Sequence, residues 1–210
     1  MLDRLPFNLG QLIYKNFNTD NLVIVSNIFS ASEFANHSTQ PISNIELKQF
    51  LKFNLDSNTK LMLPIRQITE VLKIQFGQIV PIPQMPSWVM GVYNWRGDIL
   101  WMVDLGYLIG FDPWYQRDTN RSNHTAIVLS INEKPGQLNR ETAINLGLVI
   151  SQVEDLQMCA PSTIQFPPSN SVGPELSPFL QGYWLGAENN MILVLDGQAI
   201  VAAMPQNSSS

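Results

Sequence analysis

The feature that most constrains this sequence is an internal repeat. The segment IRQITEV at residues 65–71 aligns with ISQVEDL at residues 150–156, an offset of 85 (150 − 65). Three more matches follow in the same order, at offsets of 84, 91 and 92: Ile82-Pro83 with Phe166-Pro167, Trp88–Gly91 with Phe179–Gly182, and Ile99–Asp104 with Met191–Asp196. A single match arises easily by chance, but four in one order indicate a duplicated structural unit.

Each unit reads as a set of short β-strands. Two apolar segments, residues 50–55 and 60–65, flank the turn-forming tetrapeptide at 56–59 and predict a β-hairpin. Residues 68–76 fit a strand or a helical turn, and 99–103 form an apolar run typical of a strand buried on both faces. Short strands between frequent turns favour a barrel or sandwich over a parallel sheet. Further strands are expected at residues 125–131, 145–150 and 191–195.

The pattern divides the 210 residues into three parts. We expect residues 1–47 to be a polar, partly ordered N-terminal extension, 48–204 to be the duplicated domain, and 205–210 to be a disordered tail. A polar linker near residue 120 separates a first half at about 48–112 from a second at about 121–204. Each half is marginal alone, so the halves should pack together. Exchange of strands between them stays open.

Composition excludes several classes of partner. The net charge is −5, and the Lys and Arg residues form no cluster that would neutralise phosphates, which argues against nucleic acid and anionic lipid. No apolar run approaches a membrane span, and the first ten residues do not resemble a secretory leader. The single Cys159 suits a reducing compartment and is expected to be a buried, inert thiol. We therefore expect a cytoplasmic protein without direct membrane insertion.

The chain is poor in groups that carry chemistry. Its two histidines, His37 and His124, lie in polar segments that resemble loops, and with one cysteine they do not supply a metal site. No phosphate-binding glycine loop is present. Asp104 and Asp196 end equivalent strands, and we interpret them as caps of the following turns rather than as a catalytic pair. No enzyme activity, cofactor, metal or small-molecule substrate is predicted.

The most distinctive motif is Asn94-Trp95-Arg96-Gly97. Gly97 permits a tight turn, and the Arg96 guanidinium presents a fork of donors suited to a carboxylate. Of the tryptophans, Trp95 and Trp88 are candidates for a protein interface, whereas Trp101 lies inside an apolar strand and should be core. Gly91 and Gly182 are expected to be structural turn residues.

These residues resemble the CheW family of signal-transduction adaptors. The family pattern places Pro-x-x-Val-x-Gly-Val-x-Asn-Leu-Arg-Gly before an apolar strand that ends in Asp-Leu, followed by a glycine. Its counterpart here begins at Pro86, and the similarity extends over residues 50–204. The matching positions are Val89, Gly91, Val92, Asn94, Arg96, Gly97, Asp104, Leu105 and Gly110. Trp95 departs from the pattern, because it stands where the family has leucine.

The resemblance implies a mainly β fold of two packed, SH3-like, five-stranded barrels with short helices. It implies a scaffold in chemotaxis, phototaxis or twitching motility, recruited to receptor arrays at the membrane. The partners that it implies are the regulatory domain of a CheA-like histidine kinase and the cytoplasmic tip of a chemoreceptor. It further implies an ion pair between Glu70 and Arg96 that fixes the turn carrying Trp95. An inhibitory homologue that occupies the same interface without activating the kinase stays open.

Overall fold

The computed structural model describes residues 46–56, 58–117, 123–132, 143–167, 172–186 and 190–205. The expected N-terminal extension, apart from its last two residues, and nearly all of the expected tail lie outside these ranges, as does His37. Contacts between Cα atoms group residues 47–210 into one compact unit.

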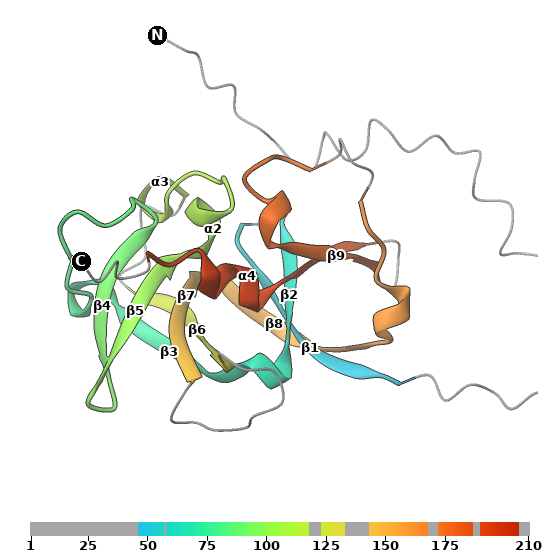
Figure 1. Ribbon diagram of the computed structural model, residues 1–210, viewed down its shortest axis with the longest axis horizontal. Helices are drawn as coiled ribbons and strands as arrows, with labels where there is room; N and C mark the ends of the chain where they lie inside the picture. The colour runs from blue at the N-terminus through green and yellow to red at the C-terminus, as the bar shows by residue number, and fades with distance from the viewer. Residues whose placement is uncertain are drawn as a thin grey trace, which may run out of the picture. The chain divides into compact units, whose positions relative to one another are not determined.

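Ten strands form two curled, five-stranded sheets (Figure 1). Sheet A has the order β8-β1-β2-β10-β9 and sheet B the order β3-β6-β7-β5-β4. The strands of sheet A are β1 (Lys48–Asn54), β2 (Lys60–Pro64), β8 (Gln152–Cys159), β9 (Leu180–Leu185) and β10 (Met191–Leu195). Those of sheet B are β3 (Ile68–Gln75), β4 (Val89–Trp95), β5 (Asp98–Asp104), β6 (Asn123–Asn132) and β7 (Ala143–Ile150).

Short helical segments connect the strands. The α-helices are α2 (Leu105–Leu108), α3 (Trp114–Arg117) and α4 (Gly197–Ala202). The 3₁₀ turns are η2 (Ile65–Gln67), η3 (Phe76–Gln78), η5 (Pro161–Thr163) and η6 (Ser177–Phe179). The fold is therefore mainly β, as the sequence predicts.

The two sequence repeats exchange their hairpins. The β1–β2 hairpin belongs to the first repeat, but β2 pairs in parallel with β10, and β1 pairs with β8. In the same way, the β6–β7 hairpin of the second repeat joins β5 and β3 of the first. The duplication is thus visible in the topology, while neither sheet is built from one sequence half alone.

Each sheet encloses its own apolar cluster. In sheet A the cluster is Phe50, Met62, Cys159, Ile192 and Val194; in sheet B it is Ile74, Ile79, Leu100, Met102, Ala126, Val128 and Val149. The opposite faces of the central strands are buried as well, for example at Leu61 in β2 and Leu129 in β6. The helix α4 follows sheet A and reaches sheet B, because a Cβ added at Gly197 would lie 3.1 Å from the Leu129 side chain. The helix α4 therefore connects sheet A to the buried side of β6 in sheet B.

Three expectations from the sequence need correction or refinement. The segment 99–103 is a strand, but it is not buried on both faces throughout, because Ile99 at its start is 73% exposed. Trp101 is only half-buried rather than part of the core. His124 does not lie in a loop: it sits in β6, is 7% exposed and stacks edge-on against Trp114. Cys159 is buried as expected, and burial raises the pKa of its thiol.

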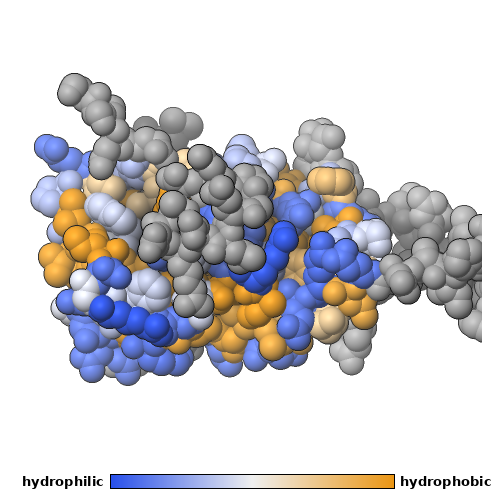
Figure 2. Space-filling view, turned by 60° about the horizontal axis from the view of Figure 1, so that its bottom comes forward, coloured by the Kyte–Doolittle hydropathy of each residue, from blue (hydrophilic) through white to orange (hydrophobic). Residues whose placement is uncertain are grey.

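The surface carries exposed apolar side chains in several places. Figure 2 shows hydrophobic areas on one face, separated by hydrophilic side chains. One group of exposed apolar side chains lies on sheet B, at Ile99 and Ile144. Another lies on β8 of sheet A and just before β1, at Leu156, Met158 and Leu47.

Candidate functional site

The predicted motif forms the turn between β4 and β5. Arg96 and Gly97 adopt φ angles of 58° and 95°, and Trp95 faces Asp98 across the hairpin. Two left-handed residues in a two-residue loop make a type I′ turn, whose twist matches that of the flanking strands. The Asn94 side chain closes the turn by accepting a hydrogen bond of 3.0 Å from the Gly97 amide. The motif therefore specifies the hairpin locally, with Arg96 at its tip.

A carboxylate from β3 ties down this turn. The Arg96 guanidinium donates to Glu70 Oε2 at 2.7 Å, and the Trp95 indole N–H donates to Glu70 Oε1. The Arg96 guanidinium carbon also lies 5.4 Å from the centre of the Trp95 ring, within cation–π range. The ion pair between Glu70 and Arg96 implied by the family resemblance is present, and Trp95 adds a second bond. We call Glu70, Trp95 and Arg96 the clasp.

The clasp joins the two edge strands of sheet B. The strands β3 and β4 are the first and last of the sheet order, so neither has a second strand partner in the sheet. Trp95 also packs against the sheet B cluster with Leu72 of β3. Arg96 keeps 68% of its side chain exposed, whereas Glu70 keeps only 24%. The clasp thus fixes the hairpin while leaving Arg96 accessible to a partner.

The repeat allows a direct comparison of the two sheets. The equivalent edge strands β3 and β8 each carry one extra residue at the same place. In β3 the register shifts between Ile68 and Glu70, and in β8 it shifts between Val153 and Leu156. At the offset of 85, Glu70 corresponds to Asp155.

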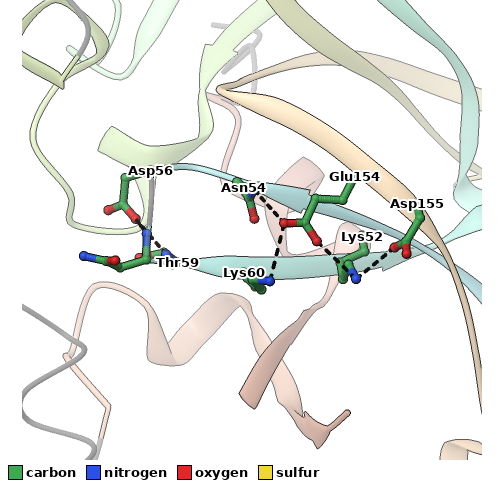
Figure 3. Close-up of polar contacts among 8 residues, drawn as sticks. Lys52, Asn54, Asp56, Thr59, Lys60, Glu154 and Asp155 are labelled. Carbon is green, nitrogen blue, oxygen red and sulfur yellow. Dashed lines mark hydrogen bonds and ion pairs between the residues drawn. The ribbon is translucent and has the colours of Figure 1, made fainter. Parts of the chain in front are cut away.

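The equivalent carboxylate is bound differently in sheet A. Asp155 forms an ion pair with Lys52, whose Nζ lies 3.0 Å from Asp155 Oδ1 and 3.1 Å from Glu154 Oε2 (Figure 3). Lys60 and the Asn54 amide complete this network at Glu154. Sheet A therefore satisfies its acidic pair within the strands β1, β2 and β8, whereas sheet B uses the β4–β5 turn. Only sheet B presents an arginine turn of this kind among the described residues.

The remaining predicted site residues have structural roles. Asp104 is buried, and its carboxylate accepts from the amides of Tyr107 and Trp114, at 3.2 and 2.7 Å. Asp196 accepts from the amides of Gln198 and Ala199 at the start of α4. The two carboxylates thus cap turns on different sheets and do not meet in one site.

The two motif glycines permit close backbone approaches. A Cβ at Gly91 would lie 2.1 Å from the Val80 carbonyl oxygen, and one at Gly182 would lie 2.6 Å from that of Gln165. At the equivalent positions, Val80 bridges to Val92 and Gln165 bridges to Tyr183. Trp88 is half-buried, and its carbonyl accepts the Asp104 amide, so it lies at the opposite end of β4 from the clasp.

Sequence reasoning missed an apolar surface that begins on β5, just after the clasped turn. Ile99 lies one residue past Asp98 and pairs with the exposed Asn94, which is the signal that its face meets solvent. On the same face of sheet B, Trp101 is half-buried and Ile144 of β7 is 38% exposed. These three side chains continue outward from the buried Leu146, which pairs with Trp101. We call Ile99, Trp101 and Ile144 the apolar strip.

No group of three or more His, Cys, Asp or Glu residues that could hold a metal ion occurs in the part of the chain that the structure describes. Within the same ranges, no helix is both long enough and apolar enough to cross a membrane.

Comparison with known proteins adds three findings. The family profile of the CheW-like domain matches residues 49–204. The crystal structure of the scaffolding protein TtCheW from Thermoanaerobacter tengcongensis superposes with a TM-score of 0.56 at 23% identity, covering 72% of this chain and 90% of that chain. No curated protein matches the sequence. The structural similarity supports the fold, and the profile supports the family.

Proposed function

The chain belongs to the CheW-like domain family, and from this membership we propose that it is a non-enzymatic scaffold that couples chemoreceptors to a CheA-like histidine kinase. The proposal includes a place in the cytoplasm, at receptor arrays on the membrane. The observation that carries it is the clasped turn of sheet B, whose exposed Arg96 is followed, three residues later, by the exposed Ile99 of the apolar strip.

This arrangement suits a protein partner. Contiguous apolar side chains on a surface mark interaction sites, especially where polar groups surround them. Ile99 is 73% exposed and follows directly on the turn that carries Arg96. Because only part of the Arg96 guanidinium is used by Glu70, its other donors are free for a carboxylate or carbonyl of the partner. An apolar helix or strand with one acidic group would match this surface.

The proposal is tested by a pull-down with the regulatory domain of the cognate kinase and with a receptor tip. The variants Arg96→Ala and Ile99→Lys should each weaken capture of at least one of these partners. Arg66→Ala is the matched control, because Arg66 is also an exposed arginine but lies in η2 and not in the β4–β5 turn. The proposal fails if both variants bind both partners as the control does, or if the unmodified chain binds neither.

A kinase assay with receptor then separates the two modes of coupling. Binding together with stimulated autophosphorylation supports an activating scaffold. Binding without stimulation supports the inhibitory homologue that the sequence leaves open.

A further inference from the structure

The edge strand β8 of sheet A carries exposed apolar side chains on its outer face. Leu156 is 53% exposed and Met158 is 44% exposed. They are neighbours on one face, because side chains two residues apart in a strand point the same way. The buried Leu51 of β1 pairs with Leu156, and Leu47, just before β1, is 55% exposed. A short apolar ridge therefore runs along this edge.

The equivalent edge of sheet B is protected. At the offset of 85, Leu156 corresponds to Val71 of β3, and Met158 corresponds to Lys73. Lys73 is an exposed residue whose ammonium donates to Thr125 Oγ1. Lysine on an edge strand is a common device against pairing with another chain. The strand β8 has methionine at that position and contains neither lysine nor proline.

We propose that β8 pairs with β8 of a second copy of this chain, antiparallel about Gln157, to form a symmetric dimer. In this register Leu156 lies opposite Met158 of the second copy, and Met158 lies opposite Leu156 of the second copy. The pattern is self-complementary, which a two-fold interface requires. Four apolar side chains then gather on one face, where cross-strand pairs stabilise a sheet.

The charges of β8 are compatible with this register. Asp155 falls opposite Cys159 of the second copy and not opposite another carboxylate. Lys52 holds both Asp155 and Glu154 in ion pairs, and Lys60 adds a second positive charge at Glu154, so the acidic pair of each copy is already balanced by two lysines. The Gln157 side-chain amide donates to the Met158 backbone carbonyl at 3.1 Å, a local bond on this strand that an added strand can replace.

The dimer goes beyond the proposed function, because it uses sheet A and leaves the clasp and the apolar strip of sheet B free. Each dimer would present two copies of the candidate partner site. Two linked sites raise the avidity for an array of partners without any new contact.

The experiment is sedimentation velocity on the full chain over a wide range of concentrations. The unmodified chain should dimerise, and Met158→Lys, which copies Lys73 of β3, should raise the dimer Kd by about tenfold or more. Val71→Lys is the matched control, because it places the same charge at an exposed position of the other edge strand. Circular dichroism checks that both variants keep the fold.

A second measurement tests the register itself. In an antiparallel pair centred on Gln157, the two Gln157 Cα atoms face each other at about 4.5–5.5 Å. Gln157→Cys should therefore give a covalent dimer with a short bis-maleimide, and Gln152→Cys, exposed on the same strand but distant from the axis, should not. A chain that stays monomeric throughout, a dimer that Met158→Lys leaves intact, or equal cross-linking of the two cysteine variants would each overturn the proposal.

Discussion

At the scale of single residues, Trp95 and Arg96 contribute differently to the stability of the clasp. An exposed ion pair contributes little to stability, because water screens it and both long side chains lose freedom. The Glu70–Arg96 pair is of this kind on its arginine side, where 68% of the side chain is exposed. Trp95 instead donates to Glu70 from a partly buried position and packs on the sheet B cluster. We infer that Trp95 holds the turn and that Arg96 serves the surface.

This division of roles predicts different stability losses. Trp95→Phe keeps a ring against the cluster but removes the indole donor, and it should lower the free energy of unfolding by about 1–2 kcal/mol. Arg96→Ala should cost less than about 1 kcal/mol. Urea unfolding at neutral pH measures both. A larger loss for Arg96→Ala than for Trp95→Phe would show that the ion pair, and not the indole, holds the turn.

At the scale of the elements, the two edge loops are fixed by backbone contacts at glycine. Gly91 has a φ of 137°, and a side chain there would meet the carbonyl of Val80, which bridges to Val92 of β4. The Gly182 position repeats this contact in sheet A. These glycines are therefore required by the close approach of a loop to an edge strand.

Substitution of these glycines should be costly. Gly91→Ala and Gly182→Ala should each lower the free energy of unfolding by more than about 2 kcal/mol, because backbone must move to admit the methyl group. Gly77→Ala is the control, since nothing lies within 4 Å of its added Cβ. Thermal melting of the three variants compares them. Similar melting temperatures for all three would contradict the close approach.

The ion network of sheet A gives a prediction on pH. Burial raises the pKa of Glu154, but the Asn54 hydrogen bond together with Lys52 and Lys60 outweighs it, so this pKa lies below its ordinary value of 4.5. A carboxylate with a lowered folded pKa stabilises the fold above its unfolded pKa, and this contribution is lost as the pH falls through the folded value. The pKa of Lys52 is raised above 10.5, chiefly by its hydrogen bond with Asp155. Its contribution is complete below 10.5 and is lost as the pH rises further.

Glu154→Gln should therefore flatten the acid side of the stability profile. Between pH 7 and the lowest pH at which the chain stays folded, the unmodified chain should lose more stability than this variant does. The measurement is urea unfolding at a series of pH values, with Asp98→Asn as a control for the loss of one exposed acidic group. If the stability profile of Glu154→Gln ran parallel to that of the unmodified chain, Glu154 would not be a source of the acid-side loss of stability.

Several features of the fold could be predicted from the sequence, whereas features that depend on neighbours in space could not. The β1–β2 hairpin and the repeat were accessible because they depend on local turn residues and on order along the chain. The exposure of Ile99 was not, because an apolar run does not reveal where a strand passes beyond the buried face of its sheet. The burial of His124 could not be predicted either, because its polar neighbours in sequence are not its neighbours in space. The Lys52 network joins strands from both repeats, and a local sequence pattern does not predict which distant strands pair.

At the scale of the whole molecule, the exchanged hairpins decide which pieces can fold. Sheet A takes β1 and β2 from one end of the chain and β8, β9 and β10 from the other. Sheet B is continuous in sequence, from β3 to β7. A cut in the linker near residue 120 therefore separates strands that must pair in both sheets at once.

This topology predicts that the two sequence halves are unfolded alone and fold together. The fragments 47–117 and 123–205 each lack at least two strands of sheet A and at least two strands of sheet B. Each fragment would therefore leave apolar edges and faces without partners. Mixed in equal amounts, they hold all ten strands and should recover the circular dichroism spectrum and a cooperative melt. A fragment of residues 66–151 is the matched comparison, because it contains every strand of sheet B and should gain β structure without a partner. If the half 47–117 folded alone while 66–151 did not, the first five strands would form a sheet of their own and the exchange of hairpins would be wrong.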